Sequence, residues 1–482
     1  MYTSEKTAML SRTPALRRLP QRLVPAGAVP HLLLGLLFFV VYAVIGVIRH
    51  VRYASMSWDL AIFVQEVRQY ASLHAPVVSV KGPGYNILGD HFSPVLALLA
   101  PAYRVFPTPV TLLVAQAALF ASSIPIVSST AAAFVSRSKS LAVGVAYGLS
   151  WGLQRGVDFD FHEICFAVPL SALALRNIIL RRWYRAAAWA AALVLVKEDM
   201  GMTVVAIALV LILLRQYALG AVLAAFGTGM LILTVKVVIP HFNPNGHYDY
   251  ASKLRGGSST GAPLDLVHGF LFTEIKLQTL GYLLLITAFL ALRSPLVLVA
   301  VPTLLWRFAS SDSAYWGMDW HYNAVLMPVL FLALIDAVRR CEAYPTPVWL
   351  RAYATQAVVP AVTAISLVLC PAMGLPVAGL FMPSTYARNA GRLTALRTAV
   401  ATVPDGATVE ANVPLLAHLA PRTTPFWIGT AVGAPRYVAL DLSTGWSDPP
   451  ESAAGYGESL HPGVRYAVVF DEQHVQVAKR VD

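Results

Sequence analysis

Apolar runs long enough to cross a membrane alternate with short polar segments along most of this chain, up to about residue 382. A helix of about 20 mainly apolar residues spans the hydrocarbon core of a bilayer. By that criterion we expect about eleven spans, so the predicted fold class is an α-helical polytopic membrane protein. Apart from one segment considered next, the spans are expected at 30–49, 110–135, 141–154, 164–180, 217–239, 277–292, 294–309, 322–338 and 354–381.

The remaining segment, 186–214, is apolar throughout except for a K-E-D triplet at 197–199. In one continuous helix the triplet would lie at the bilayer centre, where charged side chains are costly. Two short helices that meet at the triplet would bring it to the membrane surface. They would also return both flanks to the opposite side, at Arg185 and Arg215. We therefore expect two short spans here.

A large polar loop, residues 50–107, separates the first two spans. From Asp59 to His74 its apolar residues recur at the i, i+3, i+4, i+7 spacing of a helix with one apolar face. This pattern predicts an amphipathic helix lying at the membrane surface. The proline-rich stretch 94–109 is too short and too broken to cross a bilayer, so we expect a short re-entrant or interfacial helix there.

The composition changes after the last expected span. Residues 383–482 hold turn residues, charges and alternating runs such as Y-V-A-L-D-L at 437–442 and Y-A-V-V-F-D at 466–471, which are typical of strands. We predict a small α/β domain here, outside the membrane. Residues 30–382 are expected to form the membrane domain, and residues 1–29 an N-terminal tail.

The chain is 57% hydrophobic and only 13% charged, with a formal net charge of +11. Positive charge in membrane proteins collects in cytoplasmic loops, so the basic balance gives no indication of nucleic-acid binding. No interleaving of basic and aromatic residues supports it either. With the N-terminus in the cytoplasm, the Arg- and Lys-bearing turns fall inside, and the polar loops and the C-terminal domain fall outside. We predict a multi-pass protein of the cytoplasmic (inner) membrane with an extracytoplasmic C-terminal domain.

This orientation gathers most acidic and histidine-bearing loops on the outer side. For any one of these residues a solvated loop is the simpler interpretation. As a set they are harder to dismiss, because K-E-D and D-F-D-F-H-E (158–163) interrupt apolar sequence where a chain built only to span would place turn residues. The set comprises Asp59, Asp90, His91, Asp158, Asp160, His162, Glu163, Lys197, Glu198, Asp199, Asp319 and His321.

Asp59 opens the predicted surface helix directly after an aromatic residue. We hypothesise that it is a catalytic general base that takes a proton from a hydroxyl nucleophile. The alternative is a charge at a helix start with a capping role. Four cations are candidates to hold an anionic phosphate group, and they are Lys197, Arg155, His91 and Lys81. The expected supporting polar cluster is Asp90, Asp160, His162, Glu163, Glu198 and Asp199.

Each of these assignments has a structural alternative. Lys197 could pair with Glu198 or Asp199 of a neighbouring segment, and His91 could be a hydrogen-bonded loop histidine. Asp158 and His162 fall at i and i+4, a spacing that on a helix suits a divalent cation, but a capping loop explains the same residues. Cys165, Cys341 and Cys370 show no metal-binding spacing, and the chain contains no P-loop, G-x-S-x-G, G-x-G-x-x-G or H-E-x-x-H motif.

Five short patterns together resemble a known family. They are W-D-L-A-I-F-x-Q (58–65), L-G-D-H-F-S-P (88–94), L-L-x-x-Q-A (112–117), D-F-H-E (160–163) and V-K-E-D (196–199). The sequence resembles the bacterial membrane proteins of domain-of-unknown-function family 2079, from about residue 50 to the end. The layout is similar to the C-type (GT-C) glycosyltransferase superfamily, whose members use polyprenyl-phosphate sugars and bear an acidic residue in the first large external loop. Many members show paired acidic residues there, whereas this chain has the single Asp59.

The resemblance implies a membrane glycosyltransferase that moves a sugar from a polyprenyl-phosphate donor to a glycan, lipid or protein acceptor of the envelope. A transporter or flippase of a lipid-linked or anionic solute is the alternative, since short broken helices also occur in transporters. Against it, the sequence shows no inverted repeat, and its charges collect at one face instead of the midplane. A non-catalytic envelope scaffold is a third interpretation. No cofactor is implied with certainty, and a divalent cation stays open.

Overall fold

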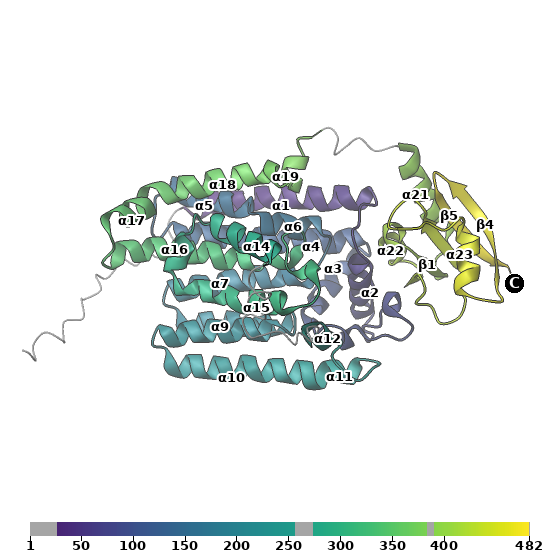
Figure 1. Ribbon diagram of the computed structural model, residues 1–482, viewed down its shortest axis with the longest axis horizontal. Helices are drawn as coiled ribbons and strands as arrows, with labels where there is room; N and C mark the ends of the chain where they lie inside the picture. Colours follow the sequence, from purple (N-terminus) through teal and green to yellow (C-terminus); the bar gives the residue numbers. More distant parts are fainter. Residues whose placement is uncertain (1–26, 256–272, 383–389, 482) are drawn as a thin grey trace, which may run out of the picture.

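The protein, described here from a computed structural model, is a bundle of helices with a small sheet domain at one end (Figure 1). The structure describes residues 27–255, 273–382 and 390–481. Most of the predicted N-terminal tail, the G-G-S-S-T-G segment at 256–261 and the predicted domain boundary at 383 lie outside these residues. The mostly helical fold with a C-terminal α/β part agrees with the predicted class.

Long apolar helices suit a membrane because each satisfies its own backbone hydrogen bonds, so that its apolar side chains can face lipid or neighbouring helices. Four are long and apolar enough to cross a membrane among the residues described: Ala28–Val51, Pro109–Ala131, Tyr217–Phe242 and Val348–Ala372. The total of eleven spans therefore stays a prediction. The bundle comprises α1 (Ala28–Val51), α4 (Pro109–Ala131), α5 (Arg137–Gly148), α6 (Trp151–Asp158), α7 (Ala167–Ile179), α8 (Trp183–Ala191), α9 (Met200–Leu213), α10 (Tyr217–Leu233), α14 (Glu274–Leu285), α15 (Val301–Ala309), α16 (Leu326–Ala343) and α18 (Val358–Ala372).

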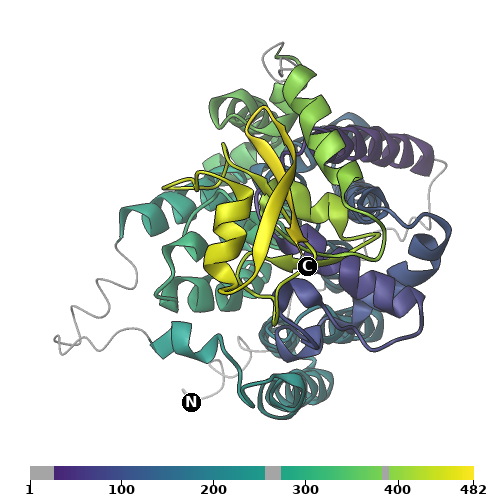
Figure 2. The same cartoon turned by 90° about the vertical axis from the view of Figure 1, so that its right-hand side faces the viewer.

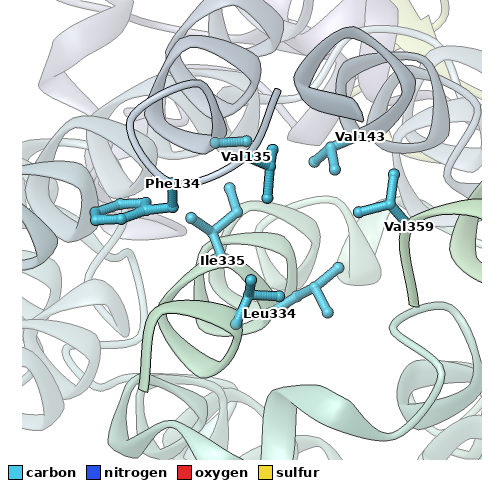
Figure 3. A pocket seen from close by; sticks show the side chains of 8 residues that line it. Phe134, Val135, Val143, Leu334, Ile335 and Val359 are labelled. Atoms are coloured by element: carbon cyan, nitrogen blue, oxygen red, sulfur yellow. The ribbon is translucent and has the colours of Figure 1, made fainter. Parts of the chain in front are cut away.

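The two ends of the bundle differ in chemistry. We call the end that carries the first loop and the sheet domain the loop end, and the opposite end the basic end (Figure 1). At the basic end Asp336 of α16 accepts hydrogen bonds from Arg339, Arg340 and Ser294. A small pocket nearby is lined only by apolar side chains of α4, α5, α16 and α18 and of the turn after α4 (Figure 3). It offers no group that could hold a polar substrate.

The predicted break at the K-E-D triplet is confirmed. Helix α8 runs into a short 3-10 turn, η5 (Ala192–Leu195), and α9 begins at Met200, so residues 197–199 lie between two short helices. Helix α9 then packs closely on α10, where a Cβ atom at Gly201 would come within 2.8 Å of the Gly227 carbonyl oxygen. A continuous helix would have carried the triplet inside an apolar environment, and the break avoids that cost.

The first loop forms helix α2 (Asp59–Ala71), three 3-10 turns and the short helix α3 (Ala100–Val105). The turns are η1 (Ser79–Lys81), η2 (Ile87–Gly89) and η3 (Pro94–Leu99). The predicted apolar face of α2 exists, since Leu60, Phe63, Val64 and Val67 are all buried. The surface that this face contacts differs from the prediction, which placed it against the membrane. The face packs on the protein's own core, including η3, α3 and α4, and α2 lies between the bundle and the C-terminal domain.

The C-terminal domain is a five-stranded sheet with helices α21 (Ala390–Thr402), α22 (Val413–Leu419) and α23 (Ala453–Leu460). The strand order is β2-β1-β3-β5-β4, and β1 pairs in parallel with β2 and β3 while the other pairings are antiparallel. The alternating runs noted in the sequence become β3 and β4. The strands are β1 (Thr408–Ala411), β2 (Thr424–Trp427), β3 (Tyr437–Asp441), β4 (Arg465–Glu472) and β5 (Val475–Val481).

The C-terminal domain covers the loop end, as Figure 2 shows from that side. Its edge strand β2 lies against η1, and Ser79 Oγ donates a hydrogen bond to the Pro425 carbonyl oxygen at 2.7 Å. Arg68 of α2 donates to the carbonyl oxygens of Ala420 and Thr423, each at 3.0 Å. Covering a sheet edge in this way satisfies its backbone and blocks unwanted strand pairing.

Candidate active site at the loop end

Asp59 occupies the first turn of α2, where the positive end of the helix dipole favours a carboxylate. Its Oδ2 atom accepts hydrogen bonds from Ser57 Oγ at 2.6 Å and from His162 Nε2 at 3.3 Å. Its Oδ1 atom forms no hydrogen bond with any residue that the structure describes. The side chain is 29% exposed. One carboxylate oxygen is thus anchored while the other stays available.

The surroundings of Asp59 keep it ionised. Burial alone would raise the pKa of this carboxyl group, since a charge is poorly solvated there. The hydrogen bond and the charge of His162, the hydrogen bond from Ser57 and the positive charge of Lys197 together lower the pKa below its ordinary value. A carboxylate with one free oxygen, held in its charged form, has the properties of a proton acceptor.

His162 is held by the segment between α6 and α7. The side chain of Gln116 on α4 donates to the Asp160 carbonyl oxygen at 2.6 Å and accepts from the His162 backbone N–H at 2.9 Å. Asp160 adopts φ 63°, a left-handed conformation that aspartate tolerates better than most residues. Gln116 therefore clamps the strained turn that places His162 against Asp59. The sequence showed it only inside the L-L-x-x-Q-A motif.

The His162 ring is fixed by stacking. Its centroid lies 3.7 Å from that of His321 and 5.0 Å from that of Phe159, with nearly parallel planes. Phe63 of α2 meets it edge-on at 5.7 Å. Burial, followed by the charges of His162 and Lys197, lowers the pKa of His321 well below its ordinary value, so His321 acts here as a neutral aromatic support.

Lys197 and Glu163 form a buried ion pair beside this group, with Nζ and Oε1 2.8 Å apart. The ion-pair alternative for Lys197 is confirmed, although the partner is Glu163 of another segment and neither Glu198 nor Asp199. Adjacent residues of a turn point in different directions, so the lysine reaches across to η4 (Glu163–Phe166). An ammonium group has three donors, and the contact with Glu163 leaves donors for a phosphate oxygen.

His91 and Glu198 form a second pair, with Nδ1 and Oε1 2.7 Å apart. The Phe92 backbone N–H and the Tyr248 hydroxyl also donate to Glu198, at 3.1 and 3.0 Å. Burial and the charge of Lys197 disfavour protonation of His91, but the Glu198 carboxylate outweighs them and raises its pKa above the ordinary value. No sequence motif pointed to Tyr248, which is 50 positions from Glu198 along the chain.

Lys81 lies at the edge of the site. It pairs with Asp90 at 3.1 Å and sits over the rings of Trp58 and Tyr85, at 5.4 and 5.6 Å from their centroids. Trp58 directly precedes Asp59, so Lys81 is close to the candidate base but not in contact with it. The structure brings this predicted phosphate ligand near the rim and not into the buried cluster.

Arg155 lies in the last turn of α6, which the sequence had suggested was already loop. One of its nitrogens donates to the Met373 carbonyl oxygen at 3.1 Å and lies 3.8 Å from Asp319, a side chain that is 68% exposed. No contact among the described residues joins Arg155 to Asp59. Of the four predicted phosphate ligands, Arg155 has the most weakly held carboxylate partner.

The two aspartates of D-F-D-F-H-E have different surroundings. Asp158 pairs with Arg49 of α1 at 2.9 Å. Asp160 accepts a hydrogen bond from the Met56 backbone N–H at 3.3 Å. Burial raises the pKa of Asp160 to about 6, against the opposing charge of Arg49. The proposed i, i+4 metal face of Asp158 and His162 is wrong, because α6 ends at Asp158 and the chain turns before His162. No group of three metal-binding side chains occurs in the described part of the chain.

The family model described as "Predicted membrane protein (DUF2079)" matches residues 49–466. No protein with a curated description matches the sequence. The fold is similar to the crystal structure of ArnT from Cupriavidus metallidurans bound to undecaprenyl phosphate, with TM-score 0.57, and to its apo state, with TM-score 0.52. In both comparisons the two sequences are 13% identical, and the match covers 94% of this chain and 98% of the ArnT chain.

Proposed function

We propose that this chain, which belongs to the DUF2079 family of predicted membrane proteins, is a membrane glycosyltransferase. The proposal rests on the similarity of its fold to ArnT and on the site at the loop end. It transfers a sugar from a polyprenyl-phosphate donor to an envelope acceptor on the outer face of the cytoplasmic membrane. Support for a lipid-linked donor comes from the related fold, since ArnT was crystallised with undecaprenyl phosphate.

The observation that carries this proposal is the half-anchored carboxylate of Asp59. Ser57 and His162 hold Oδ2 and leave Oδ1 without a partner among the described residues. Other carboxylates close by differ from Asp59. Glu163 and Glu198 are each tied to a cation and almost fully buried. Asp199 also has an oxygen without a partner among the described residues, but that oxygen is buried, and burial raises the pKa of Asp199 to about 6. Asp59, ionised and partly exposed, is therefore the acidic group best placed to receive a proton from a bound hydroxyl.

The proposed step is a single displacement with inversion at the sugar. The acceptor oxygen attacks the anomeric carbon while its proton passes to Asp59 Oδ1. The bond between that carbon and the phosphate oxygen breaks, and the electron pair leaves with the polyprenyl phosphate. A positioned base of this kind contributes about 10²–10⁴-fold in rate. The positive charges near the site stabilise the negative charge of the departing phosphate.

Lys197 and Arg155 are the proposed phosphate ligands. Lys197 lies close enough to Asp59 to influence its ionisation and keeps donors free beyond its contact with Glu163. Arg155 has an exposed and distant carboxylate partner, so a phosphate group could replace that contact at little cost. His91 and Lys81 are bound to Glu198 and Asp90, and we assign them supporting roles.

Replacing Asp59 by asparagine tests the proposal. Asp59→Asn keeps the contacts of Oδ2 but cannot accept a proton, so transfer from undecaprenyl-phosphate sugars should fall about 10²–10⁴-fold while lipid binding stays unchanged. Glu66→Gln is the matched control. Its carboxyl group lies on the same helix, and burial together with the nearby charge of Glu163 already raises its pKa well above the ordinary value.

Wild-type turnover by Asp59→Asn would remove Asp59 as the base. A parent protein that is inert with every such donor, but carries a lipid-linked solute across the membrane of vesicles, would replace the enzyme hypothesis by the transporter. The break at 197–199 is the feature that a transporter would use in that case.

A further inference from the structure

Two tryptophans from different domains meet beside Asp59. Trp58 directly precedes it on the chain, and Trp427 is the last residue of β2 in the C-terminal domain. Their ring centroids lie 5.3 Å apart with an interplanar angle of 74°, an edge-to-face contact. Such a contact between domains fixes one indole against the other.

The position of Trp427 is fixed from both sides along the chain. Two residues earlier, the Pro425 carbonyl oxygen accepts from Ser79 Oγ. Three residues later, Thr430 Oγ1 donates to the Trp427 carbonyl oxygen at 2.8 Å and lies 3.4 Å from the carbonyl oxygen of Val80. Both partners in the membrane domain belong to η1. Trp427 is thus held against Trp58, the residue that precedes the candidate base, by polar contacts between the two domains.

Both indoles remain partly exposed, and neither Nε1–H donates a hydrogen bond to any described residue. Two other tryptophans use this donor. Trp446 donates from Nε1 to the Asp441 carbonyl oxygen at 2.8 Å, and Trp316 to that of Ser310 at 2.9 Å. An exposed indole with an unused donor is an amphipathic surface that a ligand can complete.

We infer that Trp58 and Trp427 form an acceptor subsite for a carbohydrate ring, so that the acceptor of this enzyme is a saccharide; this inference rests on the proposed function. The C–H face of a pyranose packs on an indole face, and its hydroxyl groups accept from the indole N–H. Lys81, which lies over Trp58 and pairs with Asp90, supplies further donors at the rim. One ring hydroxyl then faces Asp59.

Saturation-transfer NMR on the whole protein in lipid nanodiscs tests the subsite directly. The probes are the methyl pyranosides of glucose, galactose, mannose and N-acetylglucosamine. We expect saturation of the ring C–H protons of at least one probe, an about tenfold weaker affinity in Trp427→Ala, and a smaller loss in Trp427→Phe, which keeps an aromatic face. Trp446→Phe, a tryptophan of the same domain away from Asp59, should bind like the parent.

Separate measurements keep the two proposals apart. Binding of undecaprenyl phosphate to the parent and to Trp427→Ala should be equal, because Trp427 does not contact the proposed phosphate ligands. No saturation of any probe, or equal saturation in the parent and Trp427→Ala, overturns the saccharide subsite. A parent that binds a pyranoside through Trp427 but transfers nothing from any lipid-linked donor instead overturns the glycosyltransferase and leaves the saccharide site standing.

Discussion

Lys197, His91 and Lys81 show how the charges of the loop end are arranged, since each is paired with one carboxylate from elsewhere in the chain. Residue types could be predicted from the sequence, because charges that interrupt apolar runs are costly and hence functional. Which carboxylate each cation contacts could not be predicted in this way. Lys197 reaches Glu163, 34 positions away, and bypasses its sequence neighbours. Only the packing of α7 against α8 brings these two together.

Removing Lys197 should therefore cost stability as well as donor affinity. Lys197→Met leaves the Glu163 carboxylate buried without its cation, and breaking a buried pair in this way costs about 3–5 kcal/mol. We expect a clearly lower melting temperature and weaker binding of undecaprenyl phosphate. Lys197→Met combined with Glu163→Gln should recover most of the stability but not the lipid binding. Equal lipid binding in all three proteins would exclude Lys197 as a phosphate ligand.

Asp160 should make stability depend on pH. Its pKa is raised to about 6 in the folded protein, so the folded state holds a proton that the unfolded chain releases nearer pH 4. The stabilising contribution is full below about pH 4 and is lost as the pH rises through about 6. Asp160→Asn, which tolerates the left-handed backbone, should raise the melting temperature most at pH 7.5, less at pH 5 and little near pH 4. A larger rise in melting temperature at pH 5 than at pH 7.5 would contradict the raised pKa of Asp160.

Among the elements, helix α2 shows what the spacing of apolar residues can predict and what it cannot. Its i, i+3, i+4, i+7 pattern predicted the helix and its buried face correctly. The pattern carries no information on what buries that face, and protein occupies the place expected for lipid. The same limit applies to D-F-D-F-H-E, where helical spacing of Asp158 and His162 suggested a common face. The turn at Asp160, fixed by Gln116 of another helix, separates them.

The contact of α22 with the end of α1 should be sensitive to acid. His418 stacks on His50 with centroids 4.1 Å apart and on Tyr53 at 3.7 Å. Burial, then the charges of His50 and Arg397, lowers the pKa of His418 well below its ordinary value. Because the folded pKa is depressed, this stabilising contribution is present above about pH 6.5 and is lost as the pH falls.

His418→Phe keeps the stacking but cannot take up a proton. We expect the melting temperature of the parent to fall between pH 7.5 and 5.5 by more than that of His418→Phe, measured in the same lipid. Facing groups that also carry charge, Arg397 and Arg422, stay protonated over this range and cannot produce the difference. Parallel pH profiles for the two proteins would show that the histidine stack is not responsible.

For the molecule as a whole, the order of spans and loops predicted that the first loop and the C-terminal domain share one end of the bundle, and α2, α3 and the sheet domain lie together at that end (Figure 1). The covering of α2 by the C-terminal domain was beyond sequence reasoning. It depends on single hydrogen bonds such as that of Arg68 with Ala420, between segments that share no pattern. Which end faces the cytoplasm is a prediction that labelling can test.

Cysteine labelling provides that test. The native Cys165, Cys341 and Cys370 are all buried, so they give little background. A cysteine at Glu451, exposed in the C-terminal domain, should react with an impermeant thiol reagent added to intact cells, and one at Ser138, exposed at the basic end, should react only after lysis. Labelling of Ser138→Cys alone in intact cells would invert the orientation and with it the proposed outward-facing chemistry.

The contact between η1 and β2 has a consequence for biosynthesis. Ser79 precedes Pro425 by 346 positions, so at typical translation rates of 5–20 residues per second it is made roughly 17–70 s before its partner. Throughout that interval α2 and η1 have left the ribosome without the strand that will cover them. In the predicted orientation, with the loop end outside, envelope proteases can therefore reach η1 of the nascent chain. A ribosome that stalls before β2 leaves a bundle in which the C-terminal domain does not cover the candidate base.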